Sequence, residues 1–280
     1  MLAMTTRLIS AAVGIVITLV VLFLHNTIVF PITIGILSLI MLAEYYKVNR
    51  LFKYRVATCA GMLFSLLYPI FLLGSLSRFR MLLTVLCMIA VCGEYIFRKT
   101  TMYMRSFFAT VVGMFIIPFS LSTAIYLNNA HEQHGIIYVL LALAGAWIAD
   151  SGAYFVGSAF GKHKLCPEVS PKKSIEGFIG GIVSDIVFFA LFNVIYAGVV
   201  TNKGMTVSFS WVSTIFVAIC CAVLGTVGDL SASVLKRQLE IKDYGNIMPG
   251  HGGLLDRFDS VLLVMPFFYA FISAFGFYTV

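Results

Sequence analysis

The sequence predicts an all-α polytopic membrane protein with about nine transmembrane helices, its N-terminus inside and its C-terminus outside. Of its 280 residues, 60% are hydrophobic and only 11% are charged, whereas soluble domains carry about 25% charged residues. Apolar runs of about 20 residues, the length that crosses a bilayer as a helix, recur along the chain. The Lys and Arg residues gather in every second connection between these runs, which predicts the orientation.

Nine apolar runs are long enough, or nearly so, to cross a membrane as helices. The first run follows Arg7 but is too long for a secretion signal and lacks a small-residue cleavage site, so we interpret it as a retained helix. Prolines inside the second, third and fifth runs are tolerated because neighbouring helices satisfy the freed backbone groups. The predicted helices span about residues 8–25, 28–45, 56–74, 81–97, 107–127, 136–158, 175–200, 209–229 and 260–279.

The distribution of basic residues supports this order of helices. With the N-terminus inside, the inside segments hold 16 of the 19 Lys and Arg residues, and the outside segments hold only Arg78, Arg80 and Lys203. Cytoplasmic loops are enriched in these residues, so we expect a multi-pass protein of the inner (plasma) membrane with its basic loops in the cytoplasm. This bias, together with an anionic substrate, explains the net charge of +7, and nucleic acid is not an expected partner.

The acidic residues are concentrated in the second half of the chain. Nine of the twelve Asp and Glu residues lie at or after Asp150. We therefore expect residues 1–130 to form a transmembrane scaffold and residues 131–280 to form a catalytic region with cytoplasmic polar loops. Five of the six cysteines lie inside apolar runs, where they act as small hydrophobic residues, and their spacing predicts neither a metal site nor a disulfide framework.

Asp150 follows an apolar stretch near the end of the sixth predicted helix, in the sequence DSGAYFVG. A carboxylate within a membrane helix is costly unless it is satisfied, so it marks a functional site by default. The alternative is a helix-packing Asp that accepts a hydrogen bond from a neighbouring Ser or Tyr. Asp185, in the middle of the seventh predicted helix, receives no functional role, and hydrogen bonding between helices is the simplest interpretation of it.

Two lysines, Lys172 and Lys173, stand just before the seventh predicted helix. We expect a turn at Pro171 and a helix that starts after Ser174, with Ser174 as N-cap and Glu176 in the first turn. The exposed N–H groups of a helix start and two ammonium groups together favour an anion. Simple anchoring of the helix on the cytoplasmic side is the alternative for the lysines.

Asp229, Ser233 and Lys236 are spaced so that they share one face of the eighth predicted helix. Asp229 is then placed to hold a cation, with a hydroxyl and an ammonium group beside it. A basic helix end whose side chains reach toward water would explain Lys236 but not Asp229.

Residues 236–259, KRQLEIKDYGNIMPGHGGLLDRFD, form a polar, glycine-rich block in an otherwise apolar chain. Asp256 and Asp259 lie three positions apart at the expected start of the last helix, so both can face one site. The carboxylates suit a divalent cation, and the basic side chains suit phosphate oxygens.

Glycines in the same block allow backbone to approach a ligand, notably Gly250, Gly252 and Gly253. His251 is either a metal ligand or base, or a hydrogen-bonding loop residue. No spacing of His, Cys and Glu fits zinc, and oxygen-rich ligands favour magnesium.

These motifs resemble the signature of the phosphatidate cytidylyltransferase family, the CDP-diacylglycerol synthases. DSGAYFVG and the later SPKKSIEG also resemble segments of that family, and the resemblance is specific over about residues 145–262. The signature, S-x-x-K-R-x4-K-D-x-G-x3-P-G-H-G-G-x-x-D-R-x-D, is unbroken here in Ser233, Lys236, Arg237, Lys242, Asp243, Gly245, Pro249, Gly250, His251, Gly252, Gly253, Asp256, Arg257 and Asp259.

The resemblance implies transfer of a cytidylyl group from CTP to phosphatidate, giving CDP-diacylglycerol and pyrophosphate. It also implies dependence on magnesium, with a second cation as an option, and a homodimer. Asp229 and Asp256 would be the main metal carboxylates, supported by Asp259, and Ser233 and Lys236 would take part in catalysis. The residues expected to bind substrate are Asp150, Lys172, Lys173, Ser174, Lys242, Asp243, His251, Gly252, Gly253 and Arg257.

Two other classes of function remain open at this point. Another CTP-dependent lipid enzyme, a polyprenol kinase or an ether-lipid cytidylyltransferase, would share part of the site, although the complete HGGLLDRFD block argues against the kinase. A secondary transporter would use Asp150, Asp185 and Asp229 as ion or proton sites, but it does not need a glycine-rich loop with clustered Lys and Asp.

Overall fold

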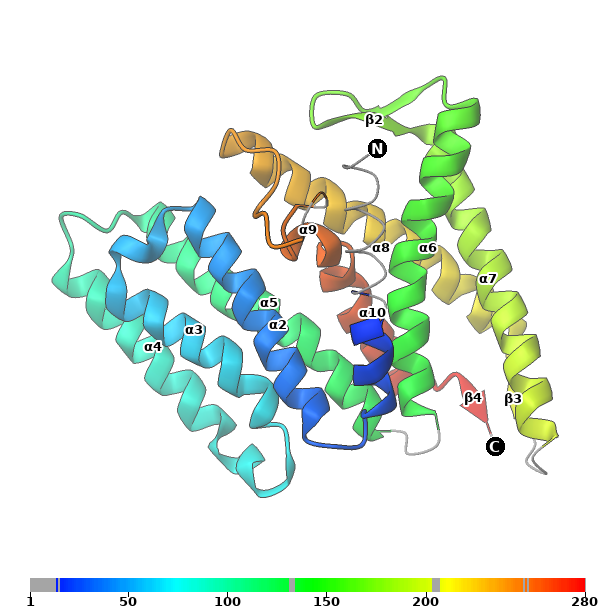
Figure 1. Cartoon of the computed structure of the whole chain (residues 1–280), viewed down its shortest axis with the longest axis horizontal. Coiled ribbons are helices and arrows are strands. Elements are labelled where there is room, and N and C mark those ends of the chain that lie inside the picture. Colours follow the sequence, from blue (N-terminus) through cyan, green and yellow to red (C-terminus); the bar gives the residue numbers. More distant parts are fainter. Residues whose placement is uncertain are drawn as a thin grey trace. The chain divides into compact units, whose positions relative to one another are not determined.

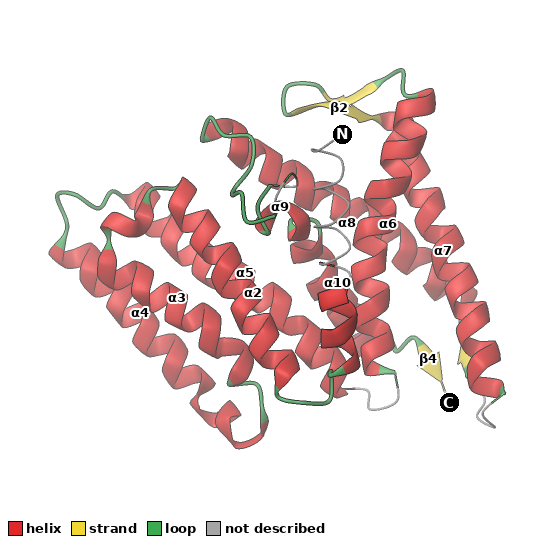
Figure 2. Ribbon diagram, viewed as in Figure 1, coloured by secondary structure: helices red, strands yellow, loops and turns green. Residues whose placement is uncertain are grey.

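The computed structural model describes residues 14, 16–130, 134–202, 207–248, 250 and 252–279, and this part of the chain is mostly helical (Figure 2). Seven of the described helical segments are long and apolar enough to cross a membrane. The third predicted span corresponds to a shorter apolar helix, α3 (Arg55–Ile70). In the first predicted span, about residues 8–25, residues 8–13 and 15 lie outside the described residues.

The chain divides into two compact units. The first contains Met1–Ile125 and Lys236–Phe258, and the second contains Tyr126–Leu235 and Asp259–Val280. The chain therefore leaves the first unit, builds most of the second, and returns with the polar block. The division of roles at residue 130 that we expect from the sequence stays a prediction.

Helices of the first unit form a packed apolar core. Its elements are α2 (Val29–Val48), η1 (Leu51–Lys53), α3, η2 (Gly74–Phe79), α4 (Arg80–Phe97), most of α5 (Met104–Ala130) and the four-residue α9 (Leu255–Phe258). The fully buried Tyr46 of α2 donates a hydrogen bond of 3.1 Å to the carbonyl of Thr110 in α5. Gly61 of α3 leaves room for that phenol, since a Cβ there would collide with it.

Glu94 is a buried carboxylate in the same unit, on α4. It accepts a hydrogen bond of 2.6 Å from the backbone N–H of Ala57 at the start of α3, and Arg98 lies 2.8 Å from its other oxygen. A buried carboxylate is tolerated when it is paired and hydrogen-bonded, so Glu94 fastens α4 to α3.

The second unit is built around two long helices that pack closely, α6 (Gly135–Phe160) and α7 (Ile175–Thr201). Small residues face one another along them: a Cβ on Gly181 would lie 2.7 Å from the carbonyl of Ala149, and one on Gly177 would lie 2.7 Å from the carbonyl of Ala153. Without side chains at these positions the two backbones approach closely, a common solution for helix pairs in membranes.

A two-stranded antiparallel hairpin connects α6 to α7, made of β1 (Lys164–Cys166) and β2 (Ser170–Ser174) (Figure 1). The predicted turn at Pro171 is therefore wrong, because this residue lies in a strand. The predicted N-cap is confirmed: Ser174 Oγ accepts a hydrogen bond of 3.1 Å from the N–H of Gly177.

The remaining elements of the second unit are β3 (Ser208–Phe209), most of α8 (Trp211–Gln238), α10 (Val261–Phe275) and β4 (Tyr278–Thr279), which pairs with β3. Tyr278 donates a 2.5 Å hydrogen bond to Asn193 of α7, and Asn193 donates one of 2.9 Å to Thr214 of α8. The strands are short additions to a fold that is otherwise helical, as the sequence predicts.

Candidate functional site

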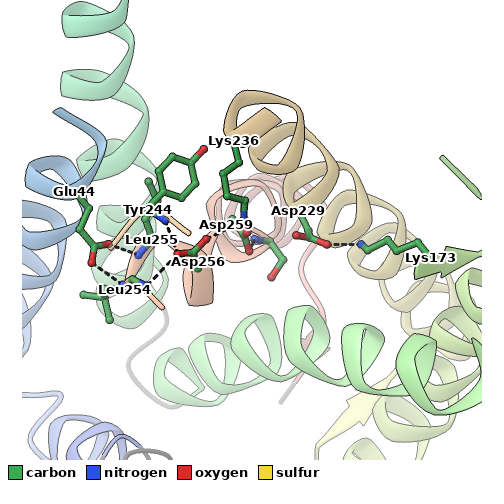
Figure 3. Close-up of polar contacts among 11 residues, drawn as sticks. Glu44, Lys173, Asp229, Lys236, Tyr244, Leu254, Leu255, Asp256 and Asp259 are labelled. Atoms are coloured by element: carbon green, nitrogen blue, oxygen red, sulfur yellow. Dashed lines mark hydrogen bonds and ion pairs between the residues drawn. The ribbon is translucent and has the colours of Figure 1, made fainter. Parts of the chain in front are cut away.

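Asp256, in α9, is the centre of a polar network in the first unit (Figure 3). Its side chain is only 3% exposed, and Oδ1 lies 2.8 Å from the ammonium group of Lys236. Oδ2 accepts hydrogen bonds from the backbone N–H groups of Tyr244, at 2.8 Å, and Gly253, at 3.0 Å. One carboxylate thus fixes the end of α8 and two points of the following loop.

Glu44 of α2 holds the same loop from the other side, and the sequence analysis assigned it no role. It is 5% exposed, and its two oxygens accept hydrogen bonds from the consecutive N–H groups of Leu254 and Leu255, at 3.0 and 2.8 Å (Figure 3). Gly245 and Gly253 lie against this carboxylate, and a Cβ on Gly253 would come within 2.7 Å of Oε2. The sequence does not reveal these partners, because they are backbone N–H groups, which every residue except proline carries.

In the second unit, the hairpin and α8 meet through an ion pair. Lys173 Nζ lies 2.6 Å from Asp229 Oδ2, and the two side chains are 22% and 26% exposed (Figure 3). Lys172, the preceding residue in β2, is exposed. The sequence predicts the same role for both lysines, whereas in the structure Lys173 pairs with Asp229 and Lys172 is exposed.

Asp259 is buried and belongs to the second unit. Its Oδ1 accepts a 2.9 Å hydrogen bond from the N–H of Ser260, and its backbone carbonyl would lie 2.6 Å from a Cβ on Gly228. The expectation that Asp256 and Asp259 begin one helix is wrong, because α9 ends at Phe258 and α10 begins at Val261.

The other predicted residues are placed less centrally. Asp229 and Lys236 both lie on α8, seven positions apart, but each pairs with a different partner. Ser233 and Asp150 are half-buried, and Lys242, Asp243 and Arg257 are exposed. Gly252 has a φ of 90°, a backbone conformation that suits glycine. His251 lies outside the described residues.

Lys242 also lines a cavity of about 470 Å³ just after α8, together with Arg237, Glu240 and Ile241. Two of these four side chains are cationic and one, Glu240, is acidic, so the lining has a small excess of positive charge. Arg237 and Lys242 both belong to the signature.

Asp185 differs from the other carboxylates. It is completely buried in α7, and neither of its oxygens has a hydrogen-bond partner among the described residues. The simple interpretation of Asp185 as a hydrogen bond between helices is therefore wrong for the part of the chain that the structure describes.

Comparison with known proteins shows the family of this chain. A family model described as the cytidylyltransferase family matches residues 5–275. The chain belongs to this family. The membership confirms the resemblance that the signature carries.

Curated relatives extend over almost the whole chain. The phosphatidate cytidylyltransferase of Bacillus subtilis (strain 168) is 33% identical over 270 residues, which are 94% of this chain and 96% of the relative. That of Haemophilus influenzae is 29% identical over 283 residues, with the same coverage of both chains. That of Staphylococcus haemolyticus is 41% identical over 143 residues, about half of each chain.

Proposed function

We propose that this protein transfers a cytidylyl group from CTP to phosphatidate, producing CDP-diacylglycerol and pyrophosphate. The observation that carries the proposal is the buried pair of Lys236 and Asp256 within an unbroken family signature. In the reaction, a phosphate oxygen of phosphatidate forms a bond to the α-phosphorus of CTP. The bond from that phosphorus to the oxygen of the β-phosphate breaks, and pyrophosphate leaves with the electron pair.

Repulsion between two anionic reactants is the main obstacle to this reaction. The phosphate of phosphatidate is already ionised near pH 7, so the site needs positive charge and alignment more than a strong base. We assign Lys236 and Lys173 to this task. Each is held at a fixed place by a carboxylate, Asp256 or Asp229.

The remaining predicted residues act as binding groups in this proposal. Lys172, Lys242 and Arg257 are exposed cations that can meet phosphate oxygens. Ser174 is committed to the start of α7, so its contribution is to orient the helix whose first N–H groups lie beside Lys173.

The carboxylates expected to bind magnesium match it in donor type only. Asp229, Asp256 and Asp259 are the residues that would hold it, and carboxylate oxygens are the ligands it prefers. Among the described residues, no three side chains of the types His, Cys, Asp and Glu form a ready metal group, and Asp229 and Asp256 each contact a lysine. When bound, magnesium supplies positive charge to phosphate oxygens and orients them.

We also propose that the active site faces the cytoplasm, because the signature and both lysine motifs lie in segments that the charge bias assigns to the inside. A lipid acceptor and a soluble nucleotide can meet only at the membrane surface. The homodimer that the family resemblance implies stays a prediction.

The test is release of pyrophosphate by the purified, detergent-solubilised protein supplied with CTP, magnesium and phosphatidate. We expect release that depends on all three, with CDP-diacylglycerol as the lipid product. Release with a polyprenol or an ether-linked acceptor instead of phosphatidate would assign another lipid substrate. Absence of release with every acceptor would refute the proposal.

A further inference from the structure

We infer that Glu44 is a positioning residue for the reaction: it fixes the loop that presents Asp256 and thereby Lys236. The inference rests on the proposed function, because the effect appears in the rate of that reaction. Its starting point is a carboxylate from α2 whose two hydrogen-bond donors are both backbone groups of the signature block (Figure 3).

The chemistry of the contact requires a carboxylate. Leu254 and Leu255 present consecutive backbone N–H groups, and each is bonded to a different oxygen of Glu44. An ionised carboxylate only accepts hydrogen bonds, so both oxygens serve. A glutamine would offer one oxygen and would turn its NH₂ group toward the other N–H.

Two carboxylates therefore hold one short stretch of chain from different sides. Glu44 holds residues 254 and 255, and Asp256 holds the N–H groups of Gly253 and Tyr244. With these four bonds in place, the backbone on which Asp256 stands has little freedom. The 2.8 Å contact between Asp256 and Lys236 depends on that position.

The sequence of the loop is adapted to Glu44. Any side chain at Gly245 would strike the carboxylate, and a Cβ at Gly253 would meet both of its oxygens at 2.7 and 2.8 Å. These glycines thus keep space for a protein carboxylate, in addition to any ligand that approaches the loop.

Glu94 provides a matched control. It is also a buried carboxylate of the first unit, and it also accepts a backbone N–H, but its partners are Ala57 and Arg98, remote in sequence from the signature block. If carboxylates at such places only stabilise the fold, then Glu44→Gln and Glu94→Gln will have the same consequences.

The experiment compares kcat, KM for CTP, KM for phosphatidate and the thermal midpoint of wild type, Glu44→Gln and Glu94→Gln. We expect Glu44→Gln to lower kcat by about a hundredfold, the effect of a small misplacement of catalytic groups, with each KM changed less than threefold. We expect Glu94→Gln to lower the midpoint at least as much and to keep kcat within threefold. Parallel losses of kcat and midpoint in both variants, or a normal kcat in Glu44→Gln, would overturn the inference.

A second set of variants tests the steric contact between Gly245 and the carboxylate of Glu44. Gly245→Ala should lower kcat in the wild-type background and cost nothing further in Glu44→Ala, where the colliding atoms are gone; equal losses in both backgrounds would contradict the proposed contact.

Hydrogen exchange at Leu254 and Leu255 should be faster in Glu44→Gln than in Glu94→Gln. This last readout needs no turnover, so a wild-type enzyme inactive with phosphatidate would refute the proposed function while exchange still tests the contact.

Discussion

Lys173 and Asp229 form an ion pair of 2.6 Å that joins the β1–β2 hairpin to α8, whereas Lys172, one residue earlier, is exposed. Neighbouring residues of a strand point to opposite faces, so only one of the two lysines can reach α8. The pair is partly accessible, and it therefore places an ammonium group where a phosphate can still approach it.

We expect Lys173→Ala to lower turnover by at least tenfold, because it removes a fixed positive charge and leaves Asp229 without its partner. Lys173→Arg should also be impaired, since the planar guanidinium differs in size and direction from an ammonium group. The measurement is steady-state kinetics with CTP and phosphatidate varied separately. Lys172→Ala should raise mainly one of the two KM values, for CTP or for phosphatidate, and thereby identify the substrate whose phosphate Lys172 contacts.

Lys164→Ala is the matched control for these variants, because Lys164 is an exposed lysine of the same hairpin. Full activity of both Lys173 variants would show that this residue anchors the hairpin and does not take part in the reaction.

Asp229→Asn and Asp256→Asn should both lower turnover by about a thousandfold, the scale expected when a ligand for the reacting phosphates or their metal is lost. Their stabilities should differ. The pair of Asp256 and Lys236 is buried, so loss of one partner costs about 3–5 kcal/mol, whereas the Asp229 pair is partly exposed. Thermal midpoints would check this, and near-normal turnover in either purified variant would count against its assignment.

Removal of divalent cations should abolish pyrophosphate release, because lysines that are each paired with a carboxylate do not neutralise the charge of CTP by themselves. We expect EDTA followed by gel filtration to give an inactive, folded protein, and magnesium to restore turnover. Zinc should not restore it, as oxygen ligands favour the harder ion. Undiminished turnover in the chelated protein would exclude a required metal.

The topology prediction can be tested in the second unit. The hairpin precedes α7 and β3 follows it, so the two must face opposite sides if α7 crosses the membrane. In a cysteine-free background, Lys164→Cys should be labelled only from the cytoplasm and Ser208→Cys only from outside. The reverse pattern would invert the orientation and contradict the proposed cytoplasmic active site, but it would not bear on which reaction is catalysed.

Asp185→Asn should raise the thermal midpoint. An ionised carboxylate buried without hydrogen bonds destabilises a protein by more than a neutral amide of the same size, and Asp185 is buried without a hydrogen-bond partner within the described structure. Circular dichroism during heating in detergent would measure the change. A midpoint lowered by several degrees would reveal a partner for this residue.

The sequence predicted the helices well because their signal is strong. Apolar runs of membrane length are unambiguous, and the start of α7 was predicted to the residue because Ser174 is an N-cap with a clear signature. The hairpin was missed because β1 and β2 have only three and five residues, one of them Pro171, which is more typical of turns.

The candidate site was predicted only in part. Residue types identified Lys236, Asp256, Lys173 and Asp229. Helix spacing placed Lys236 beside Asp229 at one site, whereas Asp229 contacts Lys173 and Lys236 contacts Asp256. Glu44 could not be found in this way, because its partners are backbone groups far along the chain, and a backbone N–H has the same chemistry whichever residue carries it.

The long separation in sequence between Glu44 and its backbone partners has a consequence for synthesis of the protein. Glu44 and Leu254 are separated by 210 positions, so at about 5–20 residues per second the ribosome needs about 10–40 seconds to deliver the partner of a carboxylate already made. Until then Glu44, in a helix apolar enough to cross a membrane, lacks these two backbone partners. A chain that ends before residue 254 would never satisfy it, and we expect such truncated products to be recognised as incomplete and degraded.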